Sequence, residues 1–216
     1  IVAITLMGER YAWVATAVMT VTILICGEIT PKVLASQIPD RLAPAIAVPL
    51  PQLLTHPAKL SMTLFLAEFL YHALKGEQQN EPLFDYVAAS LEWLDGASSH
   101  VANFHLVFLM RLARFLGFAP NLEGYTPGAF FDLRASQFCL QPPPHRDLLG
   151  PDEADKVQLM MRMDYQTMHL FRLSRRDRQR LLDVVLGYYR LHLPAFPELR
   201  SLDVLKELWD DVRDEK

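Results

Sequence analysis

A proline-dense stretch divides the chain into two unlike parts. Five prolines recur every few residues in "SQIPDRLAPAIAVPLPQLLTHPAK": Pro39, Pro44, Pro49, Pro51 and Pro57. Each proline removes a backbone donor and biases the residue before it toward extended geometry, so a regular helix cannot continue through this stretch. We therefore predict a linker at 39–57, between an N-terminal segment at 1–38 and a C-terminal domain at 58–216.

The N-terminal segment contains an uncharged apolar run. Residues 11–26 carry no charge and lie between Arg10 and Glu28. A bilayer core needs about 20 apolar residues, so the run predicts a membrane-type helix if its neighbours contribute, with membrane association through residues 11–30. A buried core helix or a pair of strands is the alternative, since β-branched residues are frequent here. The chain begins at Ile1 without a methionine, so we expect a fragment or a trimmed product.

After the linker, apolar residues recur at helical spacing. The pattern predicts helices at 59–77, 81–96, 101–118, 153–171, 173–193 and 201–216. In the first of these helices, the apolar stripe is expected to consist of Leu60, Leu64, Ala67, Leu70 and Leu74. The helix at 101–118 is apolar on nearly all sides, which indicates a position at the centre of a bundle.

Two short aromatic-rich runs, 130–133 and 138–141, flank a polar tetrad and predict a small hairpin. The expected fold class is therefore all-α: a helical bundle with a small hairpin insertion, preceded by an apolar membrane-type helix. The helix at 173–193 has Ser174 as its expected N-cap, with Asp177 three residues on as a variant of the capping box.

The sequence carries no motif of an enzyme or a metal site. It has no Gly-rich phosphate loop, no nucleophile elbow, no HExxH and no CxxC, and its seven histidines never recur at three- or four-residue spacing. We therefore predict a non-enzymatic protein with no cofactor and no metal. Cys26 and Cys139 are the only cysteines, and the apolar neighbours of Cys139 predict a raised thiol pKa.

The strongest local signal for a binding site is a cluster of arginines in "RLSRRDRQR", residues 172–180. Five of these nine residues are arginines, and they are the predicted nucleic-acid-binding residues: Arg172, Arg175, Arg176, Arg178 and Arg180. A net charge of −4 gives no global attraction to nucleic acid, so a local patch has to supply it. Cations at a helix N-terminus oppose the helix dipole, and a bound phosphate would relieve that conflict. A solvated first helical turn is the alternative interpretation.

A second candidate site lies on the apolar helix at 101–118. Its predicted partner-peptide-binding residues are Phe104, Phe108, Arg111, Arg114 and Phe115. Guanidinium groups beside exposed apolar side chains could hold a peptide carboxylate next to a hydrophobic anchor. The alternative is that both arginines simply extend to the surface along the helix.

Three runs of the C-terminal part carry a resemblance to a known family: "FLAEFLYHALKGEQQNEPLFDYVAASLEWLD", "VANFHLVFLMRLARFLGFAPNLEGY" and "YYRLHLPAFPELRSLDVLKEL". Together they resemble the C-terminal helical region of RecO, the bacterial recombination mediator, over about residues 57–209. The resemblance implies a non-catalytic, cytoplasmic role in DNA repair and recombination. Its implied partners are single-stranded DNA, the acidic C-terminal tail of single-stranded DNA-binding protein, and RecR.

The sequence departs from the RecO pattern in three places. Nothing in residues 1–56 resembles the OB-fold that the family carries. The hairpin region has one cysteine, so the four-cysteine zinc site of some members is not carried over. The helix at 101–118 lacks an arginine in its first turn, so Arg111 and Arg114 are the residues that would stand in for tail binding.

The N-terminal segment has a different likeness. "GEITPKVLASQIPDRLA", at 27–43, is similar to the motif that closes a transmembrane helix in the CorC and cyclin-M family of magnesium-transport proteins, over about residues 3–50. This likeness implies Glu28 as a weak cation-site candidate and a membrane-anchored alternative for the whole chain. A helical protein-interaction scaffold without DNA binding is a third hypothesis.

Overall fold

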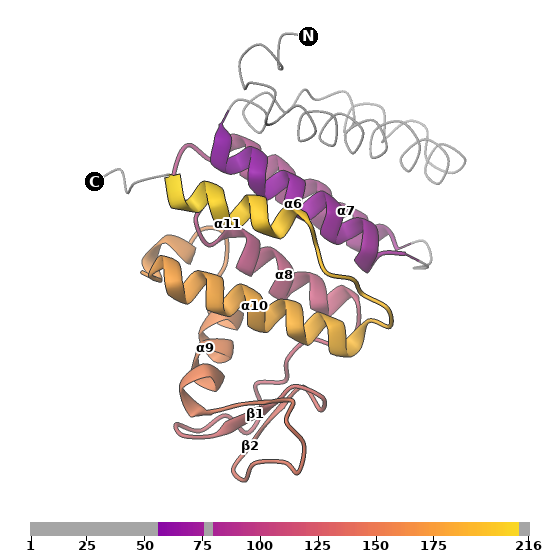
Figure 1. The fold of residues 1–216 in the computed structure, drawn as a ribbon, viewed down its shortest axis with the longest axis vertical. Helices are drawn as coiled ribbons and strands as arrows, with labels where there is room; N and C mark the ends of the chain where they lie inside the picture. The colour runs from indigo at the N-terminus through magenta and orange to yellow at the C-terminus, as the bar shows by residue number, and fades with distance from the viewer. Residues whose placement is uncertain (1–55, 76–79, 212–216) are drawn as a thin grey trace. The chain divides into compact units, whose positions relative to one another are not determined.

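A computed structural model describes residues 56–75 and 80–211, with side chains to Lys206 (Figure 1). Its helices are α6 (Pro57–Ala73), α7 (Glu81–Gly96), α8 (Phe104–Phe115), α9 (Pro151–Arg162), α10 (Arg175–His192) and α11 (Ser201–Asp211), with a 3-10 helix, η3 (Met168–Leu170). Its strands are β1 (Phe130–Asp132), β2 (Gln137–Cys139) and β3 (Leu148–Leu149). The described residues divide into two compact units, 56–71 with Leu199–Leu208, and His72–Glu198 with the end of α11.

Helix α8 is the centre of the larger unit. It packs against α7, α9 and α10, and Figure 1 shows it lying alongside α10. Nine of its twelve residues are buried, including every residue from Phe104 to Met110. The expectation that this helix lies at the centre of a bundle is confirmed.

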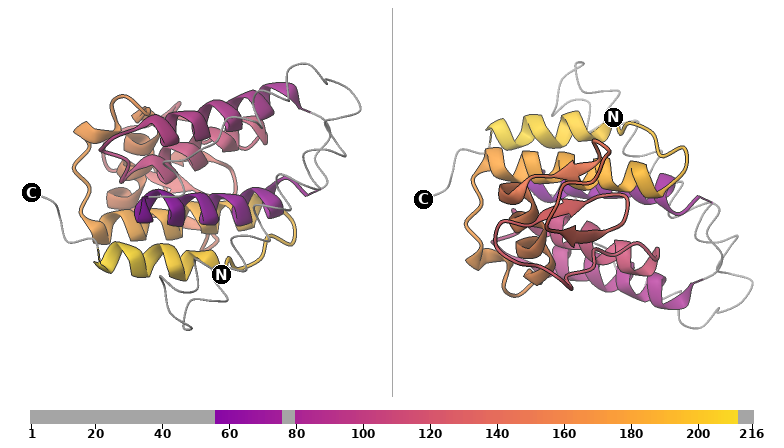
Figure 2. Two further views of the ribbon diagram at one scale, coloured as in Figure 1. Left: turned by 90° about the horizontal axis from the view of Figure 1, so that it is seen from above. Right: turned by 90° about the horizontal axis from the view of Figure 1, so that it is seen from below.

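A small antiparallel sheet lies against α9 in the same unit (Figure 2). Strand β1 pairs with β2, with Phe131 opposite Phe138, so the predicted hairpin is confirmed. Strand β3 was not predicted from the sequence; it is a two-residue strand that pairs with the other edge of β1 in the order β2-β1-β3. The expected helical bundle with a small hairpin is therefore right in its coarse form, as a helix-rich fold whose sheet has one strand more than predicted.

Side-chain caps define where two of the helices begin. Asn80 caps α7 by accepting a hydrogen bond from the Leu83 backbone at 3.1 Å, and Pro82 occupies the permitted first turn. Ser174 caps α10: its hydroxyl accepts from the Asp177 backbone at 3.1 Å and donates to the Asp177 carboxylate at 2.6 Å. The predicted capping-box variant is confirmed.

The predicted helix at 153–171 is too long, because α9 ends at Arg162. The Asp164 carboxylate accepts from both the backbone and the hydroxyl of Thr167, at 2.6 and 2.8 Å, which closes a local turn that competes with helix. Residues 163–174 therefore form a connecting loop, called here the α9–α10 loop, which contains η3. The hydrogen bonds from Thr167 are the main reason that the pKa of Asp164 is lowered.

In the smaller unit, a carboxylate of α6 holds the start of α11. Glu68 accepts from the Arg200 backbone at 3.1 Å and from the backbone and hydroxyl of Ser201 at 2.8 and 2.5 Å. An anion at a helix N-terminus is favoured by the helix dipole. The contact joins residues more than 130 positions apart in sequence.

The buried face of α6 differs from the predicted stripe. Its buried apolar residues are Met62, Phe65, Leu66, Ala67, Phe69 and Ala73. Four of the five predicted stripe residues are instead half-buried: Leu60, Leu64, Leu70 and Leu74. Because this helix is apolar around its circumference, the sequence spacing did not identify which face would be covered.

The predicted membrane-type run lies outside the described residues, as do Glu28 and most of the proline-dense linker. Within 56–75 and 80–211, none of the helices has the length and apolar character needed to cross a bilayer.

Candidate nucleic-acid interface

The five arginines of 172–180 surround the N-terminus of α10, but they do not all face solvent. Arg180 forms an ion pair with Glu153 of α9, with two guanidinium nitrogens each 2.6 Å from the same carboxylate oxygen. Arg178 is half-buried and donates to the Leu173 carbonyl at 2.8 Å, and its charge acts on the buried His105 of α8. Arg178 and Arg180 therefore each have a partner within the protein, although Arg180 is still exposed, and their role in nucleic-acid binding stays a prediction.

Arg172 and Arg176 remain available at this surface. Both side chains are exposed, and within the part of the chain that the structure describes neither guanidinium group has a hydrogen bond or an ion pair. Arg175, between them, is half-buried and engaged in an interaction of its own. The cluster thus contains two exposed cations that have no partner among the described residues, placed four residues apart on either side of the Ser174 cap.

The acid within the cluster is neutralised locally. Asp177 accepts from Ser174 and from Lys156 of α9, the latter at 3.1 Å. The hydrogen bond from Ser174, followed by the interactions with Lys156, lowers the pKa of Asp177. Its negative charge is therefore already shared with a cation of α9, which leaves Arg172 and Arg176 without a carboxylate partner among the described residues.

The α9–α10 loop that carries Arg172 is anchored by a buried side chain from the start of α8. Asn103 is only 5% exposed, and its amide nitrogen donates to the carbonyls of Met168 and Phe171 at 3.0 and 2.9 Å. The same loop carries Tyr165, whose ring stacks 4.9 Å from that of Phe104 and 5.1 Å from that of Trp93. None of these loop contacts was predicted from the sequence. The spacing of Asp164 and Thr167 is a local signal that could have indicated a turn at the start of this loop.

The predicted peptide-binding residues divide into a buried and an accessible group. Phe104 and Phe108 are completely buried, so they are core residues and their prediction as surface anchors is corrected. Phe115 is half-buried and stacks on Tyr86 with ring centroids 4.9 Å apart. Arg111 lies over the ring of Tyr165 at 5.6 Å, a cation–π distance, and Arg114 is exposed.

Hydroxyl groups connect the aromatic residues beneath this surface. Tyr86 donates to the Phe108 carbonyl at 2.8 Å, and its oxygen lies 3.1 Å from that of Tyr165. Tyr165 in turn donates to Ser90 at 2.8 Å. Burial is the main cause that raises the pKa of both tyrosines, so both hydroxyls stay protonated and serve as structural hydrogen-bond donors.

A serine and a histidine meet at the hairpin, but their geometry does not suit nucleophilic catalysis. Nε2 of His192 lies 2.8 Å from the Leu133 carbonyl and 3.3 Å from the Ser136 hydroxyl. A carbonyl can only accept, so Nε2 carries the hydrogen and cannot take a proton from Ser136. Tyr188 also contacts Ser136, at 2.6 Å, so the group fastens the hairpin turn to α10.

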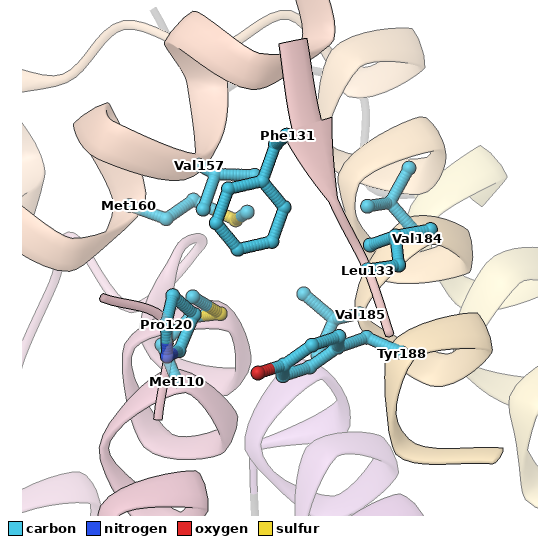
Figure 3. Close-up of a pocket in the computed structure, with 9 residues that line it drawn as sticks. All are labelled: Met110, Pro120, Phe131, Leu133, Val157, Met160, Val184, Val185 and Tyr188. Atoms are coloured by element: carbon cyan, nitrogen blue, oxygen red, sulfur yellow. The ribbon is translucent and has the colours of Figure 1, made fainter. Parts of the chain in front are cut away.

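The larger unit also contains a small apolar pocket between α8, α9, α10 and the sheet (Figure 3). It is lined by Met110, Pro120, Phe131, Leu133, Val157, Met160, Val184, Val185 and Tyr188. Its volume of about 10 Å³ is that of a single water, so it is a packing defect and not a ligand site.

In the part of the chain that the structure describes, the remaining titratable groups do not form a metal centre. Among the described residues, no three His, Cys, Asp or Glu side chains come together as metal ligands would. The prediction for Cys139 is confirmed, since burial, followed by the nearby Asp132 charge, raises the pKa of its thiol.

Comparison with protein families matches residues 54–203 to the family described as recombination protein O C terminal. A second match, to the cyclin M transmembrane N-terminal domain, covers residues 1–84, most of which lie outside the described residues. No solved structure matches the chain.

Several curated relatives share the name "DNA repair protein RecO". The protein of Phocaeicola vulgatus is 54% identical over 153 residues, which cover 71% of this chain and 64% of the relative. A Bacteroides fragilis protein is 53% identical with the same coverage, and that of Azobacteroides pseudotrichonymphae is 39% identical over 76% of this chain and 68% of its own length. The chain thus spans 64% of the length of the first two relatives, and over residues 54–203 it belongs to the recombination protein O C-terminal family.

Proposed function

We propose that this protein is a non-catalytic DNA-repair module that binds the phosphate backbone of single-stranded DNA through Arg172 and Arg176. The observation that carries the proposal is that these two arginines are exposed and have no partner among the described residues, whereas Arg178 and Arg180 of the same cluster are held by other parts of the protein. Family membership and the name that the relatives share support the setting in DNA repair.

Two features of the site favour phosphate over a protein carboxylate as its ligand. A guanidinium group matches phosphate oxygens with paired hydrogen bonds, and a positive helix N-terminus adds attraction for an anion. Contacts of this kind position a nucleic acid without reading its bases. Binding without sequence preference is therefore expected, with Arg172 and Arg176 each contacting a phosphate.

The test measures the affinity for a fluorescent single strand of DNA at low salt. It compares the wild-type full chain with two double variants that have the same net charge as each other. Arg172→Ala/Arg176→Ala removes the two available cations. Arg134→Ala/Arg180→Ala removes two cations that are paired with Asp147 and Glu153. The first variant should lose most of the binding and the second little of it. Equal losses would mean that only net charge matters, and unchanged binding in the first variant would refute the proposal.

A second candidate function is the binding of an acidic, apolar peptide tail at Arg111, Arg114 and Phe115. It is favoured by the position of Arg111 over the Tyr165 ring beside the exposed Arg114. The family resemblance points to the tail of single-stranded DNA-binding protein, and to RecR as a further partner. A labelled tail peptide should bind the wild type and bind Arg111→Ala/Arg114→Ala weakly, and equal affinities would rule out this surface.

A further inference from the structure

We infer that Asn103 is a positioning residue for the proposed DNA contact, because it fixes the α9–α10 loop that presents Arg172 and leads into Arg176. The inference rests on the proposed function. It assigns a role in that function to a residue that cannot itself touch DNA, since its side chain is buried.

The side chain of Asn103 serves a distant segment and not its own helix. Asn103 is the N-cap residue of α8, yet its side chain makes no capping hydrogen bond there. Its amide nitrogen instead donates both hydrogens to the loop, to Met168 at 3.0 Å and Phe171 at 2.9 Å. Both acceptors lie at least 65 residues further along the chain, and Phe171 is the residue directly before Arg172.

A second anchor fixes the other side of Arg172. Arg178 donates to the Leu173 carbonyl at 2.8 Å, and Ser174 then caps α10. The backbone around Arg172 is thus fixed on both sides. Asn103, at the start of α8, bonds the carbonyl of Phe171 before it, and Arg178 of α10 bonds the carbonyl of Leu173 after it. Because Arg172 has no side-chain partner in the described structure, these backbone anchors determine where its guanidinium group can reach.

The chemistry of the anchor is specific for a primary amide. An aspartate at position 103 has the same shape but no hydrogen to donate, so its oxygens would face the two carbonyls and repel them. An alanine would leave both carbonyls without this donor. A glutamine keeps the donor on a stem that is one carbon longer, so it should restore part of the function.

The chain offers a matched control in Asn80, which is also an N-cap asparagine but bonds only within its own helix. The full-length variants Asn103→Ala, Asn103→Asp, Asn103→Gln and Asn80→Ala are compared by urea unfolding and by titration of a labelled single strand over a range of salt concentrations. We expect Asn103→Ala and Asn103→Asp to weaken DNA binding severalfold and to flatten the salt dependence, by up to about 0.7 in log–log slope for each phosphate that the protein no longer neutralises. Asn80→Ala should unfold more easily but bind DNA as the wild type does.

Asn103→Ala is also made in the Arg172→Ala/Arg176→Ala background, which separates positioning of the two arginines from other effects of the substitution. If Asn103 acts through those arginines, Asn103→Ala should cause no further loss of affinity there. An equal fold-loss in both backgrounds, or a matching loss in Asn80→Ala, would overturn the inference while leaving the proposed function standing. No loss in Arg172→Ala/Arg176→Ala itself would overturn both. Should Asn103→Ala fail to fold, wild-type affinity in Asn103→Asp would be sufficient to reject the inference.

Discussion

The buried His105 predicts a specific loss of stability in mild acid. This residue lies in the first turn of α8 and has no exposed surface. Its burial, together with the positive charge of Arg178, lowers the pKa of His105 to about 3. In the unfolded chain a histidine titrates near 6.5, so as the pH falls through that value the unfolded state takes up a proton that the folded state does not.

The direction and size of the effect follow from this difference. Above about pH 6.5, protonation of His105 does not change the folding stability. Below that pH the stability falls by about 1.4 kcal/mol per pH unit, until the folded state also titrates near pH 3. Between pH 7.5 and pH 5.0 the expected loss from this one group is about 2 kcal/mol. That is a large part of the stability of an ordinary domain.

The assay is urea unfolding at pH 7.5 and pH 5.0 for the wild type, His105→Leu and His169→Leu. The control removes a histidine that is exposed. The wild type and His169→Leu should lose about 2 kcal/mol more on acidification than His105→Leu does, because only the last has no buried imidazole. If all three proteins lose the same amount, His105 is not held neutral in the core and the packing described for α8 is wrong.

Four further substitutions test the packing and the helix caps by urea unfolding at neutral pH. Phe104→Ala should cost about 3–5 kcal/mol because the ring is fully buried, whereas Leu170→Ala, at a position that is 67% exposed, should cost less than about 0.5 kcal/mol. Ser174→Ala should cost about 1 kcal/mol because α10 is left without its side-chain cap, and a value near zero would contradict the capping contact. Glu68→Ala should cost about 2 kcal/mol, because the Ser201 end of α11 loses a charged acceptor, and faster amide exchange in α11 than in the wild type should accompany the loss.

Local patterns in the sequence predicted the features that depend on neighbouring residues. The cap of α10 follows from the spacing of Ser174 and Asp177, and the hairpin follows from two aromatic-rich runs around a polar turn. The central place of α8 follows from its own apolar residues, which occupy nearly all sides of the helix. These features were predictable because short-range hydrogen bonding and hydrophobic periodicity decide them.

Features that depend on residues distant in sequence were either not predicted or predicted wrongly. The amide of Asn103 bonds carbonyls more than 60 residues away, and nothing in its own neighbourhood indicates this. The cluster of arginines was visible, but only the tertiary structure shows that Arg180 meets Glu153 and that Arg178 points into the protein. Likewise, Phe104 is apolar whether it lies in the core or on a binding surface, so its sequence context could not distinguish these two roles.

The salt dependence of single-strand binding tests the central claim most directly, namely that Arg172 and Arg176 contact DNA phosphates. The logarithm of the association constant is measured against the logarithm of salt concentration for the wild type and Arg172→Ala/Arg176→Ala. Each phosphate contact with a single strand contributes about 0.7 to the slope, so the double variant should be flatter by about 1.4. Parallel lines for the two proteins would show that neither arginine meets a phosphate and would contradict the account.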